Sequence, residues 1–322
     1  MDLVFSSHRC HTLYGVIVLK AYHRINWSSF VPDAQGREHL ITALCGLHPS
    51  VSRRVIGKSL CGRSIDLLQL GAGDDPVLLC GAFHGMEWLT SLLLLRFTSQ
   101  MAAALETGSL ISDIKLGDFL RRRGVTVIPC VNPDGVEISL HGSAAAGEYR
   151  ELVHNVSCGD TSRWQANARG VDLNHNFNAG WEALHTLEQE QGIYHPAPTR
   201  YGGEYPESEP ETRLLCDFCR SQYFRHALAF HSQGEEIYWD FGERTPEKSR
   251  LMAQVLAASS GYEMSEPEAI ATGGGFKDWF ISCFCRPAFT IEIGKGENPL
   301  PLSDLPGIHR TLEEMLVFSI IM

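Results

Sequence analysis

His84 and Glu87 are the pair of side chains in this sequence whose types and spacing point most clearly to metal chemistry. They follow an apolar run at residues 77–83 that predicts a buried strand, so both side chains would emerge where that strand gives way to a turn. Zn²⁺ binds imidazole nitrogen and carboxylate oxygen, and a catalytic zinc site uses three protein ligands and one open position. The pair alone is weak, because His-x-x-Glu spacing also arises by chance, with a structural histidine beside a surface glutamate.

Further polar side chains stand at the ends of predicted strands. His231 and Glu292 each lie at or near the end of an apolar run, and Asn132 follows a third. In an α/β sheet, the loops that leave the carboxyl ends of the strands carry the ligand sites. This shared context strengthens the metal hypothesis.

The predicted elements alternate between strands and helices. We expect strands at 54–57, 64–70, 76–83, 125–131, 226–231 and 288–293, and helices at 33–47, 88–105, 110–122, 209–222, 246–260, 276–284 and 305–320. A Pro-Asp-Gly turn is expected at 133–135, and residues 142–207 form a long loop-rich segment. This order predicts an α/β domain with a central, mostly parallel mixed sheet covered by helices.

The composition is that of a globular protein. The 322 residues are 44% hydrophobic and 20% charged, and we expect an N-terminal arm at 1–33 followed by one domain at 34–322. A net charge of −11 without a long basic run argues against nucleic-acid binding, and no apolar run is long enough to predict a membrane span. Ten scattered cysteines predict a reducing, cytoplasmic location. A structural zinc is the alternative for four of them, although their spacing is atypical for one: Cys216, Cys219, Cys283 and Cys285.

Five separated motifs resemble the zinc carboxypeptidases related to carboxypeptidase A, over residues 35–322. They are His84-Gly-Met-Glu87, Gly170-Val-Asp-Leu-Asn-His-Asn-Phe177, His231-Ser232, Asp278-Trp279 and Glu292. Within that family, His231-Ser-Gln-Gly-Glu-Glu-Ile-Tyr-Trp239 and Gly57-Lys-Ser-x-x-Gly-Arg63 resemble the bacterial γ-D-glutamyl-meso-diaminopimelate peptidases of type I. The resemblance implies a single-domain α/β/α sandwich.

The resemblance also implies roles for the residues at the strand ends. His84, Glu87 and His231 would bind one zinc ion per chain, and Glu292 would be the general base and acid. The apolar neighbours of Glu292 should raise its pKa, which suits a group that takes a proton from zinc-bound water and returns it to the leaving amine. The alternatives are a core histidine at His231 and a solvent-facing edge glutamate at Glu292.

Three positions depart from the carboxypeptidase pattern. The family has an Arg directly after the Asn of Asp-Leu-Asn, where the pair grips a C-terminal carboxylate. This sequence has Asn174-His175, and imidazole cannot form the bidentate fork of guanidinium. The family's oxyanion-stabilising Arg aligns with Gln165, which leaves Arg163 or Arg169 to supply a charge, and its mobile Tyr aligns with Ile270. A plain C-terminal exopeptidase is therefore not the expected function.

The expected function is hydrolysis of γ-D-glutamyl-diaminopimelate bonds in peptidoglycan-derived peptides by Glu-assisted attack of zinc-bound water. Candidate substrate contacts, besides Asn174 and Gln165, are charged or ionisable loop residues that face either carboxylates (His175, Arg169, Arg200) or the ammonium of diaminopimelate (Glu235, Glu236, Asp240). For each charge, a solvated loop position is the alternative. For the whole chain, the alternatives are a metallocarboxypeptidase or amidase-like deacylase of altered specificity, or a non-catalytic muropeptide-binding domain. The partner in each case is a peptide or muropeptide, and the sequence does not predict an oligomeric state.

Overall fold

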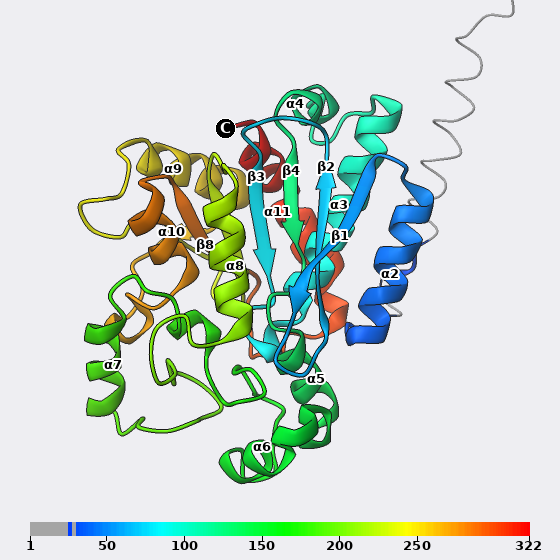
Figure 1. Cartoon of the computed structure of the whole chain (residues 1–322). Helices are drawn as coiled ribbons and strands as arrows, with labels where there is room; N and C mark the ends of the chain where they lie inside the picture. The colour runs from blue at the N-terminus through cyan, green and yellow to red at the C-terminus, as the bar shows by residue number, and fades with distance from the viewer. Residues whose placement is uncertain (1–24, 28–29) are drawn as a thin grey trace, which may run out of the picture.

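The computed structural model of the chain describes residues 25–27 and 30–322 (Figure 1). Most of the N-terminal arm expected at 1–33 lies outside the described residues, so its boundary with a domain that starts at residue 34 stays a prediction. Within its described part, Trp27 is buried in the same hydrophobic cluster as Leu40 and Leu44 of helix α2. The last residues of this segment therefore pack on the main body.

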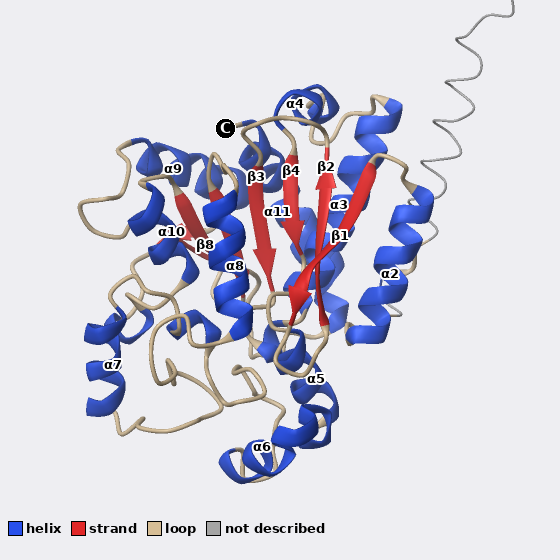
Figure 2. Ribbon diagram, viewed as in Figure 1, coloured by secondary structure: helices blue, strands red, loops and turns tan. Residues whose placement is uncertain are grey.

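Eight strands form one mixed sheet in the order β1-β2-β4-β3-β5-β8-β6-β7. Their bounds are β1 Val51–Lys58, β2 Ser64–Leu70, β3 Val77–Gly81, β4 Val125–Ile128, β5 Ala227–His231, β6 Glu236–Tyr238, β7 Glu263–Met264 and β8 Ala288–Glu292. The central strands β4, β3, β5 and β8 are parallel, whereas β1, β2 and β6 join their neighbours on the centre side in antiparallel pairs. The carboxyl ends of the central strands therefore meet at one edge of the sheet, the lower edge in Figure 2.

Helices cover both faces of this sheet. The α-helices described are α2 Ala34–Leu47, α3 Leu89–Thr107, α4 Leu116–Arg123, α5 Pro133–His141, α6 Arg150–Val156, α7 Trp181–Glu190, α8 Pro210–Ser221, α9 Lys248–Ser260, α10 Phe276–Phe284 and α11 Leu305–Ile321. On one face α2, α3, α4, α9 and α11 share a hydrophobic cluster with the strands, and α8 and α10 do so on the other. In Figure 2, α8 lies in front of the sheet while α3 and α11 lie behind it. The fold is the predicted α/β/α sandwich.

The alternation along β3 explains how one strand serves both layers. Val77 and Leu79 belong to the cluster under α3 and α11, while Leu78 and Cys80 belong to the cluster under α8 and α10. Side chains two apart on a strand share a face, so a strand buried on both sides is apolar throughout. This is why the run at 77–83 has no polar alternation.

The prediction of a turn at 133–135 is wrong, because these residues begin α5. The side-chain oxygen of Asn132 accepts the backbone N–H of Gly135 at 2.8 Å and so caps the helix. Pro133 takes the first helical position, where a missing N–H costs nothing. The segment at 142–207 also holds α6 and α7, so it is less irregular than expected. Elsewhere the predicted elements are confirmed to within a few residues, except that α4 begins six residues later than expected, at Leu116; β2 and α10 have the predicted bounds.

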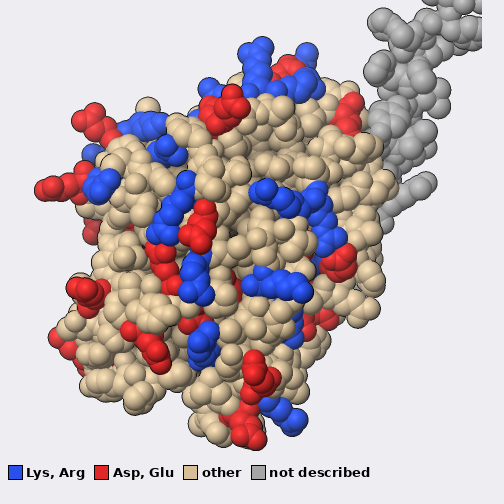
Figure 3. Space-filling model, viewed as in Figure 1, with Lys and Arg blue, Asp and Glu red and all other residues tan. Residues whose placement is uncertain are grey.

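Two surface properties of the described chain bear on its partners. Within residues 25–27 and 30–322, no helix combines the length and apolarity needed to cross a membrane. On the face drawn in Figure 3, Lys and Arg side chains are interspersed with Asp and Glu. That face has no broad basic surface of the kind that binding to nucleic-acid phosphates requires.

Candidate metal centre and active site

Three strand ends bring the candidate ligands and Glu292 together. β3 ends shortly before His84, and the chain then forms a 3₁₀ turn that carries Glu87. His231 is the last residue of β5 and Glu292 the last of β8, and the two residues are paired across these parallel strands. Gly85 allows the turn to pack closely, because a Cβ atom there would lie 2.2 Å from a backbone oxygen of α5.

One ring nitrogen from each histidine meets the carboxylate of Glu87. His84 Nδ1 lies 2.7 Å from Glu87 Oε1, and His231 Nδ1 lies 3.0 Å from Glu87 Oε2. The two Nδ1 atoms are 3.4 Å apart. Zinc–nitrogen bonds of about 2 Å at tetrahedral angles would separate two nitrogens by roughly 3.3 Å, so the spacing fits a zinc ion. Two imidazoles and one carboxylate are also a donor set that catalytic zinc sites use with an open position.

Asp172 orients His84, and the sequence reasoning assigned it no role. Asp172 Oδ1 lies 3.1 Å from His84 Nε2, and Asp172 Oδ2 accepts the backbone N–H of Arg200 at 2.9 Å. A proton held on Nε2 by this carboxylate leaves Nδ1 free for a metal. Burial opposes the ionisation of Asp172, but the charges of His84 and His175 hold its pKa well below its usual range. Asp172 also caps a short helix in the Asp-Leu-Asn segment, where its Oδ1 accepts the Asn174 N–H, but this local role does not predict the distant contact with His84.

Packing rather than a carboxylate orients His231. Its ring stacks on Phe83 with centroids 5.1 Å apart and planes 18° apart, and the residue is 1% exposed. Burial lowers the pKa of His231, which keeps the ring neutral, as a metal ligand must be. Its Nε2 atom is buried and has no hydrogen-bond partner among the residues the structure describes. The two histidines therefore present the same donor atom by different means.

Glu292 has the surroundings of a proton carrier. Burial and then the charge of Glu87 raise the pKa of Glu292 well above its usual value, and His84 opposes this shift. Glu236, which faces Glu292 across the β6–β8 pair, raises it further. A carboxyl group with a raised pKa can accept a proton and release it again near neutral pH. The position suits the general base and acid expected from the sequence, and that role stays a prediction.

Two predicted substrate contacts, His175 and Asn174, have partners inside the protein. His175 is 7% exposed, and its Nδ1 lies 2.8 Å from Glu188 Oε1 on α7. The other oxygen of Glu188 lies 3.1 Å from His185 Nδ1. Asn174 Oδ1 accepts the backbone N–H of Phe276 at the start of α10. Substrate contact by either side chain stays a prediction. For His175, such a contact would compete with its buried contact to Glu188.

The backbone of Gln165 contacts the turn that carries His84 and Glu87. Its carbonyl oxygen accepts the N–H of Gly85 at 3.0 Å and a side-chain N–H of Asn132 at 3.1 Å. Its side-chain oxygen accepts a hydrogen bond from the Thr199 hydroxyl. Arg163, an alternative source of a cation, is exposed on the same segment. The segment around Gln165 therefore lies next to the candidate metal ligands, and the Gln165 side-chain amide is hydrogen-bonded to Thr199.

Arg169 and Glu235, two further predicted substrate contacts, each form an ion pair. Arg169 Nε lies 3.3 Å from Glu209 Oε2, beside a cavity of about 170 Å³. Glu235 Oε2 lies 2.6 Å from Lys295 Nζ. Both pairs consist of residues outside the His84–Glu87–His231 group. Their contact with substrate stays a prediction.

Other candidate sites among the described residues are weaker. A second group of possible metal ligands consists of Asp33, Glu137 and His141, but it is partly exposed. Asp33 caps α2, and Glu137 accepts the backbone N–H of Ala34, so both carboxylates already have donors. Neither of the two possible metal groups among these residues contains a cysteine, so nothing supports a structural zinc at the four cysteines.

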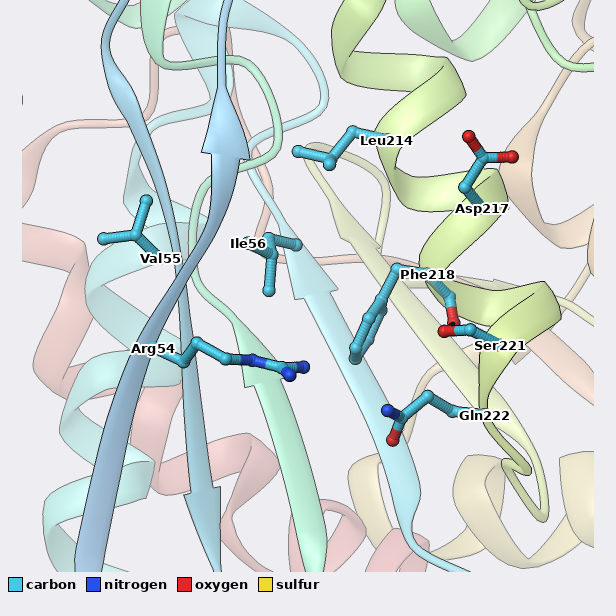
Figure 4. Close-up of a pocket in the computed structure, with 8 residues that line it drawn as sticks. All are labelled: Arg54, Val55, Ile56, Leu214, Asp217, Phe218, Ser221 and Gln222. Carbon is cyan, nitrogen blue, oxygen red and sulfur yellow. Dashed lines mark hydrogen bonds between the residues drawn. The ribbon is translucent and has the colours of Figure 1, made fainter.

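A hollow of about 330 Å³ lies between β1 and α8, away from the metal group (Figure 4). Figure 4 shows the Arg54 side chain extending from β1 toward Phe218 of α8. The guanidinium carbon of Arg54 lies 5.6 Å from the centre of that ring, so the hollow is partly closed by a cation–π contact. The residues that line this hollow do not include either of the possible metal-binding groups.

Comparisons with known proteins agree with this geometry. The sequence profile of a family described as zinc carboxypeptidase matches residues 38–315. The chain is 35% identical over 265 residues to γ-D-glutamyl-L-diamino acid endopeptidase 1 of Lysinibacillus sphaericus, which covers 82% of this chain and 65% of that protein. It is 31% identical over 288 residues to the uncharacterized protein YqgT of Bacillus subtilis, covering 88% of this chain and 76% of that protein. The crystal structure of thrombin-activatable fibrinolysis inhibitor superposes on this chain with a TM-score of 0.72, over 93% of this chain and 76% of that one. The two sequences are 17% identical, so this match is evidence for a shared fold and for nothing further.

Proposed function

This chain belongs to the zinc carboxypeptidase family and is a zinc metallopeptidase, and we propose that it hydrolyses γ-D-glutamyl-meso-diaminopimelate bonds in peptidoglycan-derived peptides. In this proposal His84, Glu87 and His231 hold the zinc ion, and Glu292 carries the proton. The observation behind it is the convergence of both Nδ1 atoms on the Glu87 carboxylate, next to an acid with a raised pKa. We further propose a cytoplasmic location, as the cysteine usage predicts.

Zinc, when bound, supplies a Lewis acid that polarises the scissile carbonyl and makes water more acidic. The residues of the chain account for the remaining chemistry. Glu292 accepts a proton from the attacking water and then donates it to the departing amine nitrogen. Asp172 keeps His84 in the tautomer that offers Nδ1, and Phe83 fixes the plane of His231.

The choice of substrate rests on what the Asn174-His175 pair does not offer. A guanidinium at the second position would bind an ordinary C-terminal carboxylate through two hydrogen bonds. Here His175 is buried against Glu188 instead. The endopeptidase of Lysinibacillus sphaericus, whose name specifies γ-D-glutamyl-L-diamino acid bonds, is among the similar proteins and supports a bond of this type.

The variant Glu292→Gln tests the assignment of the proton carrier. We expect turnover to fall by about a thousandfold, the size of a general acid–base contribution, with one zinc per chain retained. Cleavage would be followed on a γ-D-glutamyl-diaminopimelate peptide, and zinc by metal analysis of the same sample. Near-normal turnover in this variant would show that Glu292 is not the proton carrier. A panel of peptides with free and blocked C-termini separates the proposed endopeptidase from a carboxypeptidase or deacylase.

A further inference from the structure

Glu236 stands in a row with a metal ligand and the proposed proton carrier. β5 and β8 pair His231 with Glu292, and β8 and β6 pair Glu292 with Glu236. Residues directly opposite each other on neighbouring strands project from the same face of a sheet. The backbone of Glu236 therefore lies about one strand spacing, roughly 5 Å, from that of Glu292, and the two side chains share one face of the sheet. The row is His231, Glu292 and Glu236, across three adjacent strands.

Tyr238 fixes the side chain of Glu236. The Tyr238 hydroxyl donates to Glu236 Oε2 at 2.6 Å, as expected for two residues on the same face of β6. Gly234 leaves room for this conformation, because a Cβ atom there would lie 3.3 Å from Glu236 Oε2. Both Glu236 and Tyr238 are half-buried, so both side chains remain partly accessible to a ligand. Sequence reasoning missed Tyr238 and named Glu236 as one of three options.

Glu236 forms no ion pair among the described residues, unlike the neighbouring Glu235. The next residue, Glu235, forms an ion pair with Lys295 at 2.6 Å. Among the ion pairs of the described residues, none includes Glu236 or Glu292. Two acids directly opposite each other on adjacent strands repel when both are charged. A cation brought by a ligand would relieve this repulsion.

The proposed reaction indicates where such a cation would come from. Glu292 donates its proton to the departing amine, so the residue that owns this amine must lie beside Glu292. In the proposed substrate that residue is diaminopimelate, whose side chain ends in a carbon that carries a second, free ammonium group and a carboxylate. Glu236 is the next acid along the same row. An ammonium group has three N–H donors, which suit a carboxylate oxygen and the oxygen of a phenol.

We propose that Glu236, held in place by Tyr238, binds the free ammonium group of the diamino acid on the leaving side of the scissile bond. This inference rests on the proposed function and deepens it. Glu236 is then the specificity residue that selects diamino acids over residues with uncharged or acidic side chains. Of the three acids considered for this contact, Glu235 is the weaker candidate, because it is already paired with Lys295.

The test compares two γ-D-glutamyl peptides that differ in one group. One carries meso-diaminopimelate, and the other carries 2-aminopimelate, which keeps the distal carboxylate and has hydrogen in place of the ammonium. The zinc-loaded, full-length chain should prefer the first by about tenfold to a hundredfold in kcat/KM, the range for a charged hydrogen bond. In Glu236→Gln the preference should shrink to within about threefold, through loss on diaminopimelate alone. Tyr238→Phe should give an intermediate preference, because it keeps the carboxylate and removes its anchor.

Glu263→Gln is the matched control. Glu263 pairs with Glu236 in the β6–β7 register and is exposed, so the variant removes one negative charge a strand further from Glu292. It should keep the wild-type preference. An equal loss on both peptides in Glu236→Gln, or a wild-type chain that does not discriminate between them, overturns the ammonium contact and leaves the proposed function standing. A wild-type chain that cleaves neither peptide overturns the proposed function and this inference with it.

Discussion

The polar side chains of two regions behave in opposite ways. At the carboxyl ends of β3 and β5, the side chains of His84, Glu87 and His231 meet, and Glu292 at the end of β8 is paired in register with His231. In the segment at 160–209, His175 and Asn167 instead contact carboxylates of the same segment, those of Glu188 and Glu209. The first region has the arrangement that we propose for a metal site, whereas these contacts of the second region stabilise the segment itself. Polar composition alone does not distinguish the two.

Asn176 and Asn167 show how the second region is held. Asn176 donates to the carbonyl oxygen of Gly202 at 2.7 Å and to the Ser208 hydroxyl at 2.9 Å. Asn167 donates to Glu209 Oε2 at 2.7 Å. Buried backbone groups outside regular structure need such side-chain partners. The segment therefore keeps a defined shape with little helix and no strand among its described residues.

Loss of a metal ligand should produce the largest effect in the first region. His231→Ala removes one of three ligands, so we expect zinc content to fall far below one per chain and turnover to fall by more than about a thousandfold. Metal analysis and peptide cleavage measure the two effects. His141→Ala is the control, because it alters the second group of possible ligands and should leave zinc at one per chain. Full zinc content in His231→Ala would break the assignment of this region.

Loss of a buried partner should produce the largest effect in the second region. Glu188→Ala leaves His175 and His185 without their shared carboxylate, and we expect a loss of about 3 kcal/mol in the free energy of unfolding. Urea unfolding measures this loss. The folded variant should keep kcat/KM for the diaminopimelate peptide within about threefold. If stability is unchanged and kcat/KM collapses, the segment serves the substrate rather than itself.

Glu211, a buried residue of α8 that accepts the backbone N–H of Leu60 at 2.8 Å, offers a pH test. Burial and the charge of Asp134 raise its pKa to about 7 from 4.5. Below about pH 4.5 the carboxyl is protonated in both the folded and unfolded states, so it costs no stability. Between pH 4.5 and 7 the unfolded chain releases this proton first, so stability falls as pH rises, by about 3 kcal/mol in all. Glu211→Gln should remove this loss, and urea unfolding at pH 5 and pH 7.5 measures it. The same stability gap between wild type and variant at both pH values would rule out this titration.

Asp172 joins the two regions, and its neutral variant should have the smallest effect. Asp172→Asn keeps the size of the side chain but weakens its hold on the His84 Nε2 proton. We expect about a tenfold loss of zinc affinity, the lower end for partners of metal-bound histidines. Competition with a chelator measures the affinity. An unchanged affinity would mean that packing alone orients His84, as it orients His231.

Much of the first region could be predicted from the sequence, because its residues follow apolar runs that end at the same sheet edge. His84, Glu87, His231 and Glu292 were placed in this way, and their convergence needs only the parallel order of the strands. Asp172 was harder to assign, since it reaches His84 across 88 positions of sequence. No periodicity predicts such a contact.

The second region could not be predicted to the same degree, since its side chains find partners by tertiary folding. His175 is an ionisable residue of the kind expected to contact a substrate carboxylate, yet its ring contacts the carboxylate of Glu188, thirteen positions further along the chain. β6, with three residues, is too short for an alternation pattern, so the pairing of Glu236 with Glu292 was not visible in the sequence. Asn132 shows a third cause, because its cap converts a turn signal into the start of α5.

Mass spectrometry of the products from a defined muropeptide tests the central claim most directly. The peptide would contain a γ-D-glutamyl-meso-diaminopimelate bond followed by a C-terminal residue, and the zinc-loaded chain would be incubated with it. We predict two products that divide the peptide between the γ-carbonyl of glutamate and the amine of diaminopimelate, and no such products with Glu292→Gln. Release of the C-terminal residue alone would contradict the account, because it would identify a carboxypeptidase.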